Sequence, residues 1–171
     1  MDLVTEHHPT PARAARCDGG VERHLTEPAV MLAMAHWLIG HGATDVEIHP
    51  DGIHLKQLDM GEWISARGFM KTMQIGATEA GGRYENGSIT VTIDPRPGIG
   101  DVVAMIDGKR IEIEAKGGCI NSRHPGPLSK LRKHLYEAVG MLLDSHNDAD
   151  RLIAAVPRHP ETERVAQRMA E

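Results

Sequence analysis

The chain has 171 residues, a formal net charge of −5, and a hydrophobic fraction of 40%. This length and composition fit a compact domain with a real core and argue against wholesale disorder. The acidic balance excludes binding to polyanions through bulk charge alone. Aromatic residues make up only 3% of the chain. The core must therefore be aliphatic, and a base-stacking platform for single strands is not expected.

The cysteine content and the N-terminus bear on location. Cys17 and Cys119 are too few for a disulfide framework, which favours a reduced, cytoplasmic setting. The first residues lack a basic region followed by an apolar run, so we expect no signal peptide. No apolar run approaches the ~18 residues of a membrane span, so we expect no membrane partner.

Residues 1–24 are rich in Pro, Arg, His and Gly and show no periodicity, so we interpret them as a flexible arm. Residues 25–171 then form a single predicted domain. It opens with a helix, because Thr26 offers a capping hydroxyl and Pro28 suits the first turn. Helical spacing continues to Ile39, where a Gly-His-Gly segment ends it.

The middle of the chain has weaker signals. A short hairpin is predicted from Val46–His49 and Ile53–Leu55, because Pro-Asp-Gly separates them. Residues 57–82 favour neither helix nor strand and stay unassigned. Ser88–Ile93 alternates and is β-branched, so it is predicted as a strand.

The C-terminal third predicts a loop, a helix, a strand and a helix. These are residues 117–127, Leu128–Leu143, Leu152–Val156 and Glu161–Ala170. The whole order predicts an α/β fold with a mixed sheet.

The strongest local signal is a hairpin of Asp101–Ile106 and Lys109–Lys116. The Asp-Gly pair between them is typical of a two-residue turn, which fixes the pairing. Ile106 then faces Lys109, and Asp101 faces Glu114.

Alternation along this hairpin separates two faces. The apolar face holds Val102, Ala104, Ile106, Ile111, Ile113 and Ala115, and the polar face holds Asp101, Glu112, Glu114 and Lys116. Opposed carboxylates repel by a few tenths to ~1 kcal/mol. Either water and Lys116 offset that repulsion on a solvated face, or a hard cation such as Mg²⁺ lies between the oxygens.

At these residues the chain resembles the PD-(D/E)xK nuclease superfamily, also called restriction-endonuclease-like. Asp101 matches the acid that starts one strand, and Glu114 and Lys116 match the (D/E)-x-K of the next. Gly100 stands where the family usually has Pro. The similarity covers roughly residues 24–157, and it implies the restriction-endonuclease-like αβββαβ core, a mixed sheet flanked by helices.

The resemblance also implies a metal centre. Asp101, Glu114 and the carbonyl of Ala115 would bind Mg²⁺ or Mn²⁺, and Lys116 would orient or help deprotonate the attacking water. Glu27 matches the family's helix acid, a further metal ligand. Its alternative role is an ordinary carboxylate favoured at a helix N-terminus.

Basic residues around the predicted helix at 128–143 are candidates for contacts with substrate phosphates. They are Arg123, His124, Lys130, Arg132, Lys133 and His134. The alternative is a solvated helix face. Some relatives carry Gln-x-x-x-Tyr in this helix, and here Arg132 stands at that spacing from Tyr136.

Together these patterns predict a Mg²⁺-dependent nuclease that hydrolyses phosphodiester bonds, with DNA as the expected partner. Many members of that superfamily are homodimers, so the resemblance is also compatible with a homodimer. Two alternatives remain: a non-catalytic member of the fold that binds nucleic acid or protein, and an unrelated α/β assembly domain with a solvated acidic face. The histidines lack the paired spacing of a zinc site and are interpreted as surface side chains. Both cysteines are interpreted as incidental thiols.

Overall fold

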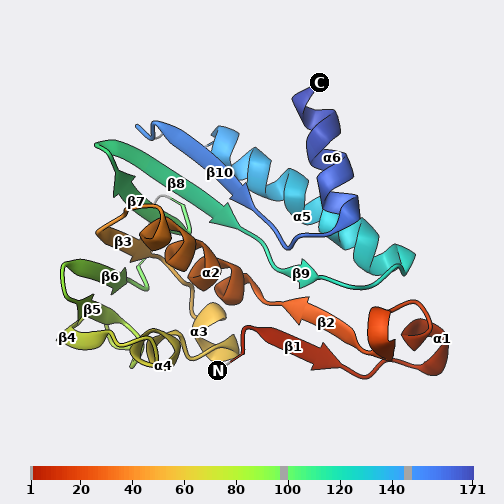
Figure 1. Ribbon diagram of the computed structural model, residues 1–171, viewed down its shortest axis with the longest axis horizontal. Helices are drawn as coiled ribbons and strands as arrows, with labels where there is room; N and C mark the ends of the chain where they lie inside the picture. Colours follow the sequence, from red (N-terminus) through yellow and green to blue (C-terminus); the bar gives the residue numbers. More distant parts are fainter. Residues whose placement is uncertain (1, 97–99, 145–147) are drawn as a thin grey trace.

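A computed structural model describes residues 2–96, 100–144 and 148–171. The chain is an α/β protein with a seven-stranded mixed sheet and a small antiparallel sheet, flanked by helices (Figure 1). In sheet order, the large sheet contains β10 (Arg151–Ala155), β8 (Lys109–Ala115), β7 (Val102–Ile106), β3 (Asp45–Ile48), β6 (Ile89–Ile93), β5 (Gly82–Asn86) and β4 (Met70–Gln74). β10 runs parallel to β8 and β3 parallel to β6, and the other neighbours are antiparallel.

The small sheet joins the N-terminal residues to the segment after β8. Its strands are β1 (Val4–His7), β2 (Glu22–Leu25) and β9 (Gly118–Cys119). The helices are α1 (Pro11–Ala14), α2 (Glu27–Gly40), α3 (His54–Gln57), α4 (Met60–Ser65), α5 (Pro125–Asp144) and α6 (Pro160–Ala170), with a 3₁₀ turn at Asp18–Gly20. None of the helices in the described part of the chain combines the length and the apolar character needed to cross a bilayer.

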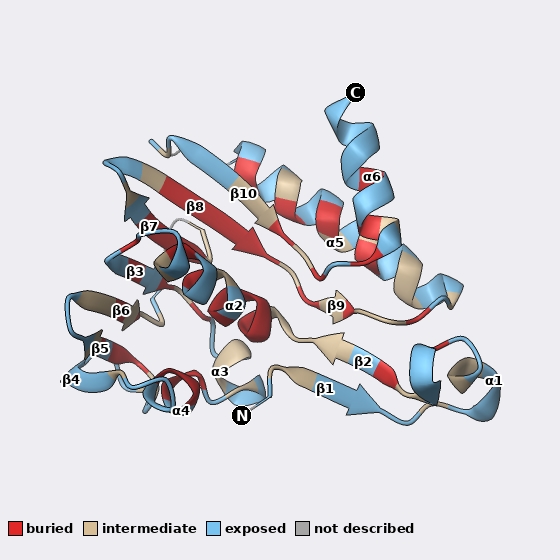
Figure 2. Cartoon of the chain, viewed as in Figure 1, coloured by how far each residue is buried: buried red, intermediate tan, exposed pale blue. Residues whose placement is uncertain are grey.

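The core lies between the large sheet and α2. Met31, Leu32 and Leu38 of α2 are fully buried against alternate residues of β3, β7 and β8. Burying each such side chain stabilises the fold by roughly 1.5–3 kcal/mol. The long helix α5 covers β8 and β10 from the other face, which leaves the middle of β8 buried on both sides (Figures 1 and 2).

The predicted Asp-Gly hairpin is confirmed. Asp107 and Gly108 both have positive φ, of 51° and 72°, as a two-residue turn that follows the strand twist requires. β7 and β8 pair in the predicted register, with Val103 opposite Glu112. The polar side of this hairpin is not a solvated face, because α5 covers it and Glu112 is 0% exposed.

The predicted strand at Ile53–Leu55 is wrong, and so is the hairpin that it would have completed. The carboxylate of Asp51 accepts hydrogen bonds from the backbone N–H groups of Ile53 (2.7 Å) and His54 (2.8 Å). These bonds begin the short helix α3, and β3 pairs with β6 and β7 instead. A three-residue segment carries too little pattern to outweigh these hydrogen bonds.

Two further segments differ from their sequence interpretation. The structure describes β1, α1 and β2 in the segment where a flexible arm is expected, and β2 pairs with β9 through His24 and Cys119 in the expected loop. The unassigned residues 57–82 contain α4 and β4. The remaining predicted helices and the strands at Val46–His49, Ser88–Ile93 and Leu152–Val156 are confirmed within a few residues.

Candidate functional site

The end of β8 meets the start of β7 beside the first turn of α2. Asp101 lies one residue before β7, and its N–H donates to the carbonyl of Ile113 at 2.9 Å, which continues the hairpin register towards Glu114. Asp101 Oδ2 accepts a hydrogen bond of 2.7 Å from the N–H of Ala115. This bond holds the carboxylate over the segment that contains Glu114 and Lys116.

Lys116 joins two of the predicted carboxylates. Its Nζ donates to Glu114 Oε1 at 2.7 Å and to Glu27 Oε1 at 3.1 Å. The side chains of Glu114, Lys116 and Glu27 are 6%, 14% and 25% exposed. We call Glu27, Asp101 and Glu114, with Lys116 among them, the acidic cluster.

Two glycines allow these segments to approach. A Cβ on Gly117 would lie 2.7 Å from the backbone N of Glu27 and from the carbonyl O of Leu25, so no larger residue fits between β8 and the start of α2. Gly100, before Asp101, has φ +77°. Proline, which the family usually has there, is fixed near −65° and cannot adopt this conformation.

Burial and like charges perturb the acidic cluster. Burial, together with the negative charges of Glu114 and Glu27, raises the pKa of Asp101 to about 6 against the lowering effect of the Ala115 hydrogen bond and of Lys116. Burial alone would lower the pKa of Lys116, but its hydrogen bonds to Glu114 and Glu27 outweigh burial and raise it. Lys116 is therefore held as an ammonium ion.

His54 lies beside this cluster, although the sequence predicted it to be a surface side chain. Its Nε2 lies 3.3 Å from Glu27 Oε1, and its side chain is 13% exposed. The bond to Glu27 raises the pKa of His54. Burial would raise the pKa of Glu27, but hydrogen bonds from His54 and Lys116 hold it below its ordinary value. The sequence signal for this position was Asp51, three residues before His54, because an aspartate can accept the first backbone N–H bonds of a helix.

The donors of the acidic cluster suit a hard divalent cation, because carboxylate oxygens are what Mg²⁺ and Mn²⁺ prefer. Asp101 has no cationic side chain within 4.0 Å among residues 2–96, 100–144 and 148–171, so its buried charge lacks a direct partner. The three carboxylates do not converge within 4.8 Å of one another. Lys116 Nζ lies between Glu27 and Glu114 and donates to both.

A second group of polar side chains lies on the small sheet. Ligand atoms of Glu22, His24 and Cys119 lie within 4.8 Å of one another, close enough to hold a metal ion. However, Arg13 donates to both carboxylate oxygens of Glu22, and His24 bonds one of them at 2.6 Å. Burial raises the pKa of the Cys119 thiol. The charge of this group is therefore already balanced, and it forms an ion-pair network.

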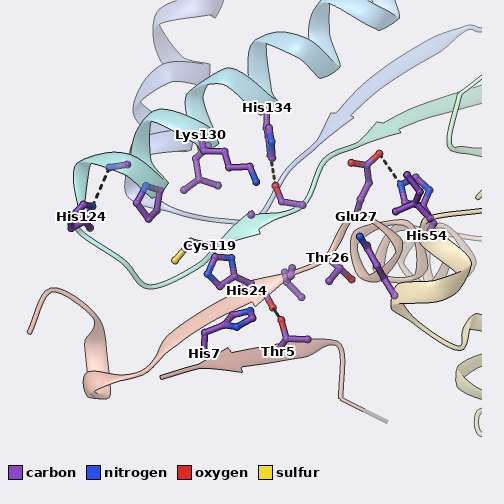
Figure 3. Close-up of a pocket in the computed structure, with 18 of the residues that line it drawn as sticks. Thr5, His7, His24, Thr26, Glu27, His54, Cys119, His124, Lys130 and His134 are labelled. Atoms are coloured by element: carbon purple, nitrogen blue, oxygen red, sulfur yellow. Dashed lines mark hydrogen bonds and ion pairs between the residues drawn. The ribbon is translucent and has the colours of Figure 1, made fainter. Parts of the chain in front are cut away.

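A cleft of about 760 Å³ runs between the small sheet and α5 (Figure 3). We call it the histidine cleft, because five histidines line it: His7, His24, His54, His124 and His134. Glu27 and His54 face each other at one end, and His124 lies at the other, with Lys130 on α5 between them. Glu27 is thus shared by the cleft and the acidic cluster.

The structure separates the predicted phosphate-contacting residues. Lys130, His124 and His134 line the histidine cleft. The other three are ion-paired elsewhere: Arg123 with Asp18 at 3.1 Å, Arg132 with Glu161 at 3.1 Å, and Lys133 with Glu137 at 3.2 Å. Glu112, on the same strand as Glu114, bonds Arg110 at 2.9 Å.

Comparisons with protein-family models, curated proteins and solved structures find no significant match for this chain.

Proposed function

We propose that this chain is a divalent-metal-dependent nuclease of the PD-(D/E)xK type, which hydrolyses phosphodiester bonds in DNA. The observation that carries the proposal is the acidic cluster. Three carboxylates from two separated segments and one ammonium gather beside a cleft. Carboxylates whose pKa values are perturbed by burial and by like charges cluster at functional sites.

Asp101, Glu114 and the carbonyl of Ala115 would hold Mg²⁺ or Mn²⁺. A bound divalent ion polarises a phosphate and lowers the pKa of a bound water. The protein would fix the positions of these ligand atoms before a metal ion binds. The 2.7 Å bond from the Ala115 N–H fixes one oxygen of Asp101. Its other oxygen accepts no hydrogen bond from the described residues and is free for a ligand.

Lys116 acts as a charged donor in this proposal. Its raised pKa keeps the proton on Nζ at neutral pH. It therefore orients water and offsets negative charge that develops on the phosphate, and it does not remove a proton. Glu27 holds Nζ from the cleft side at 3.1 Å, and His54 in turn bonds Glu27. Glu27 and His54 are thus positioning residues.

The net reaction is a simple hydrolysis. A water oxygen forms a new bond to phosphorus while the bond from phosphorus to one sugar oxygen breaks. The water loses one proton and the leaving sugar oxygen gains one, which yields a phosphate monoester and a free hydroxyl.

Cleavage assays test the proposal. We expect wild-type protein to cleave duplex, single-stranded or branched DNA with Mn²⁺ and not with EDTA. Asp101→Ala and Lys116→Ala should each reduce the rate by roughly 10²-fold or more. Lys109→Ala is the matched control, because this exposed lysine lies on the same strand outside the cluster.

Two outcomes separate the proposal from its alternatives. DNA binding without cleavage, unchanged in Asp101→Ala, would favour the non-catalytic member of the fold. If Mn²⁺ neither promotes cleavage nor changes the melting temperature, the acidic cluster is structural and the assembly domain is favoured.

A further inference from the structure

The histidine cleft leads to the acidic cluster. Glu27, Asp51, His54 and Gly117 line one end of it. Because Lys116 bonds Glu27 at 3.1 Å and precedes Gly117, a chain-like ligand in the cleft would reach the cluster at this end. Glu114, only 6% exposed, is recessed behind that opening.

Away from this end the cleft favours anions. Its carboxylates among the described residues are Glu27, at the cluster end, and Asp51, which lies 3.4 Å from His54 at the same end, while Lys130 lies on the α5 wall. Lys130 has no carboxylate within 4.0 Å in the portion of the chain that the structure describes. Gly126 and Pro127, in the first turn of α5, also line the cleft. A helix N-terminus carries partial positive charge, which adds to the lysine.

One histidine offers a further donor on the α5 side. His134 does not, because its Nδ1 lies 2.6 Å from the carbonyl of Gly117 and must donate there, which fixes the ring beside the end of β8 and leaves Nε2 of a neutral ring as an acceptor. His124 Nδ1 accepts from the N–H of Gly126 at 3.3 Å. A neutral His124 ring must therefore carry its proton on Nε2, which leaves a donor for a ligand oxygen.

The opposite wall presents rings. His7 and His24, from β1 and β2, lie edge to face with their centroids 5.0 Å apart (Figure 3). Histidine rings stack on unpaired bases, as Phe, Tyr and Trp rings do. The cleft thus has a cationic wall and a ring-bearing wall, although Phe, Trp and Tyr are absent from the residues that line it in the described chain.

The size of the cleft decides between one strand and two. A volume of about 760 Å³ is that of a pocket for one small molecule. It admits a few nucleotides of a single strand and excludes a double helix.

We infer that the histidine cleft binds a single strand of nucleic acid, with phosphates along Lys130 and His124 and bases towards His7 and His24, and guides it to the acidic cluster. The inference rests on the proposed nuclease function and names its substrate class: single-stranded ends, flaps or gaps.

Binding without cleavage tests it. Fluorescence anisotropy in EDTA compares a labelled single-stranded oligonucleotide with a blunt duplex of the same length and sequence. We expect the single strand to bind roughly tenfold more tightly or better. Lys130→Ala should weaken single-strand binding roughly fivefold and reduce the slope of log K against log salt by about 0.7, the value for one lost phosphate contact.

Lys109→Ala is the control, because this exposed lysine lies at the start of β8 and is not among the residues that line the cleft. It should leave affinity and salt slope unchanged. Equal affinity for duplex and single strand, or equal losses in the two lysine variants, would overturn the inference.

Cleavage measured in parallel with Mn²⁺ keeps the two proposals apart. Cleavage together with equal affinity for duplex and single strand leaves the nuclease standing and removes the cleft assignment. Single-strand binding that depends on Lys130, without cleavage, removes the nuclease and leaves the cleft assignment standing.

Discussion

Replacing Asp101 by Asn should stabilise the metal-free protein, although the same change should abolish metal binding at the acidic cluster. The carboxylate is half-buried near Glu114 and Glu27, and its pKa of about 6 lies roughly two units above the ordinary 3.8. At 1.36 kcal/mol per unit, the ionised carboxylate destabilises the fold by at most about 3 kcal/mol. Because Asp101 is only partly buried, solvent screening reduces this to about 1–2 kcal/mol.

The sign of the effect depends on pH. Since the folded pKa is raised, the contribution of Asp101 to stability is fully present below 3.8 and is lost as pH rises through about 6. Asn cannot ionise, and its side-chain oxygen still accepts the hydrogen bond from Ala115. At about pH 8 in EDTA, Asp101→Asn should therefore melt about 2–8 °C above wild type. The gain should shrink as pH falls below about 6.

Thermal melts of both proteins across this pH range provide the test. Asp94→Asn is a control of opposite sign, because its hydrogen bond from Arg96 lowers the pKa of Asp94. That variant should lose stability at about pH 8. If Asp101→Asn melts at or below the wild-type temperature at this pH, the ionised Asp101 carboxylate does not destabilise the fold. Adding Mn²⁺ should raise the melting temperature of wild type and not of Asp101→Asn.

Three further changes have definite expected outcomes. Lys116→Ala should lower the free energy of unfolding by about 2–4 kcal/mol in urea titrations, because it leaves two partly buried carboxylates without their shared cation; an unchanged midpoint would contradict this. Gly117→Ala should destabilise by about 1–3 kcal/mol through its 2.7 Å backbone clash, whereas Gly140→Ala, with open space around it, should be neutral or stabilising by up to about 1 kcal/mol. In Glu27→Gln the pKa of His54, measured by NMR of its ring protons, should fall, because Glu27 is the largest cause of its raised value.

The parts of the fold that could be predicted are those set by local chemistry. The Asp107-Gly108 turn fixes which residues of β7 and β8 face each other, and this register places Asp101 near Glu114. Gly117 then lets the end of β8 approach α2. The acid pair and the lysine were therefore accessible from sequence, whereas the register alone could not indicate that α5 covers this face.

The missed parts depend on contacts between residues distant in sequence. β9 is two residues long and exists because His24, almost a hundred residues earlier, pairs with Cys119. His54 reaches Glu27 only because Asp51 starts a short helix where apolar residues suggested a strand. The histidine cleft is assembled from β1, β2, α3 and α5, so no single window of sequence contains its pattern.

The central claim is that a divalent ion binds between Asp101 and Glu114. Crystals soaked in Mn²⁺ and measured for anomalous scattering test it directly. We predict a single strong peak within about 2–2.3 Å of oxygens from both carboxylates, and no peak there in Asp101→Asn crystals. A peak at Glu22, His24 and Cys119 instead, or no peak near Asp101 at saturating Mn²⁺, would contradict the account.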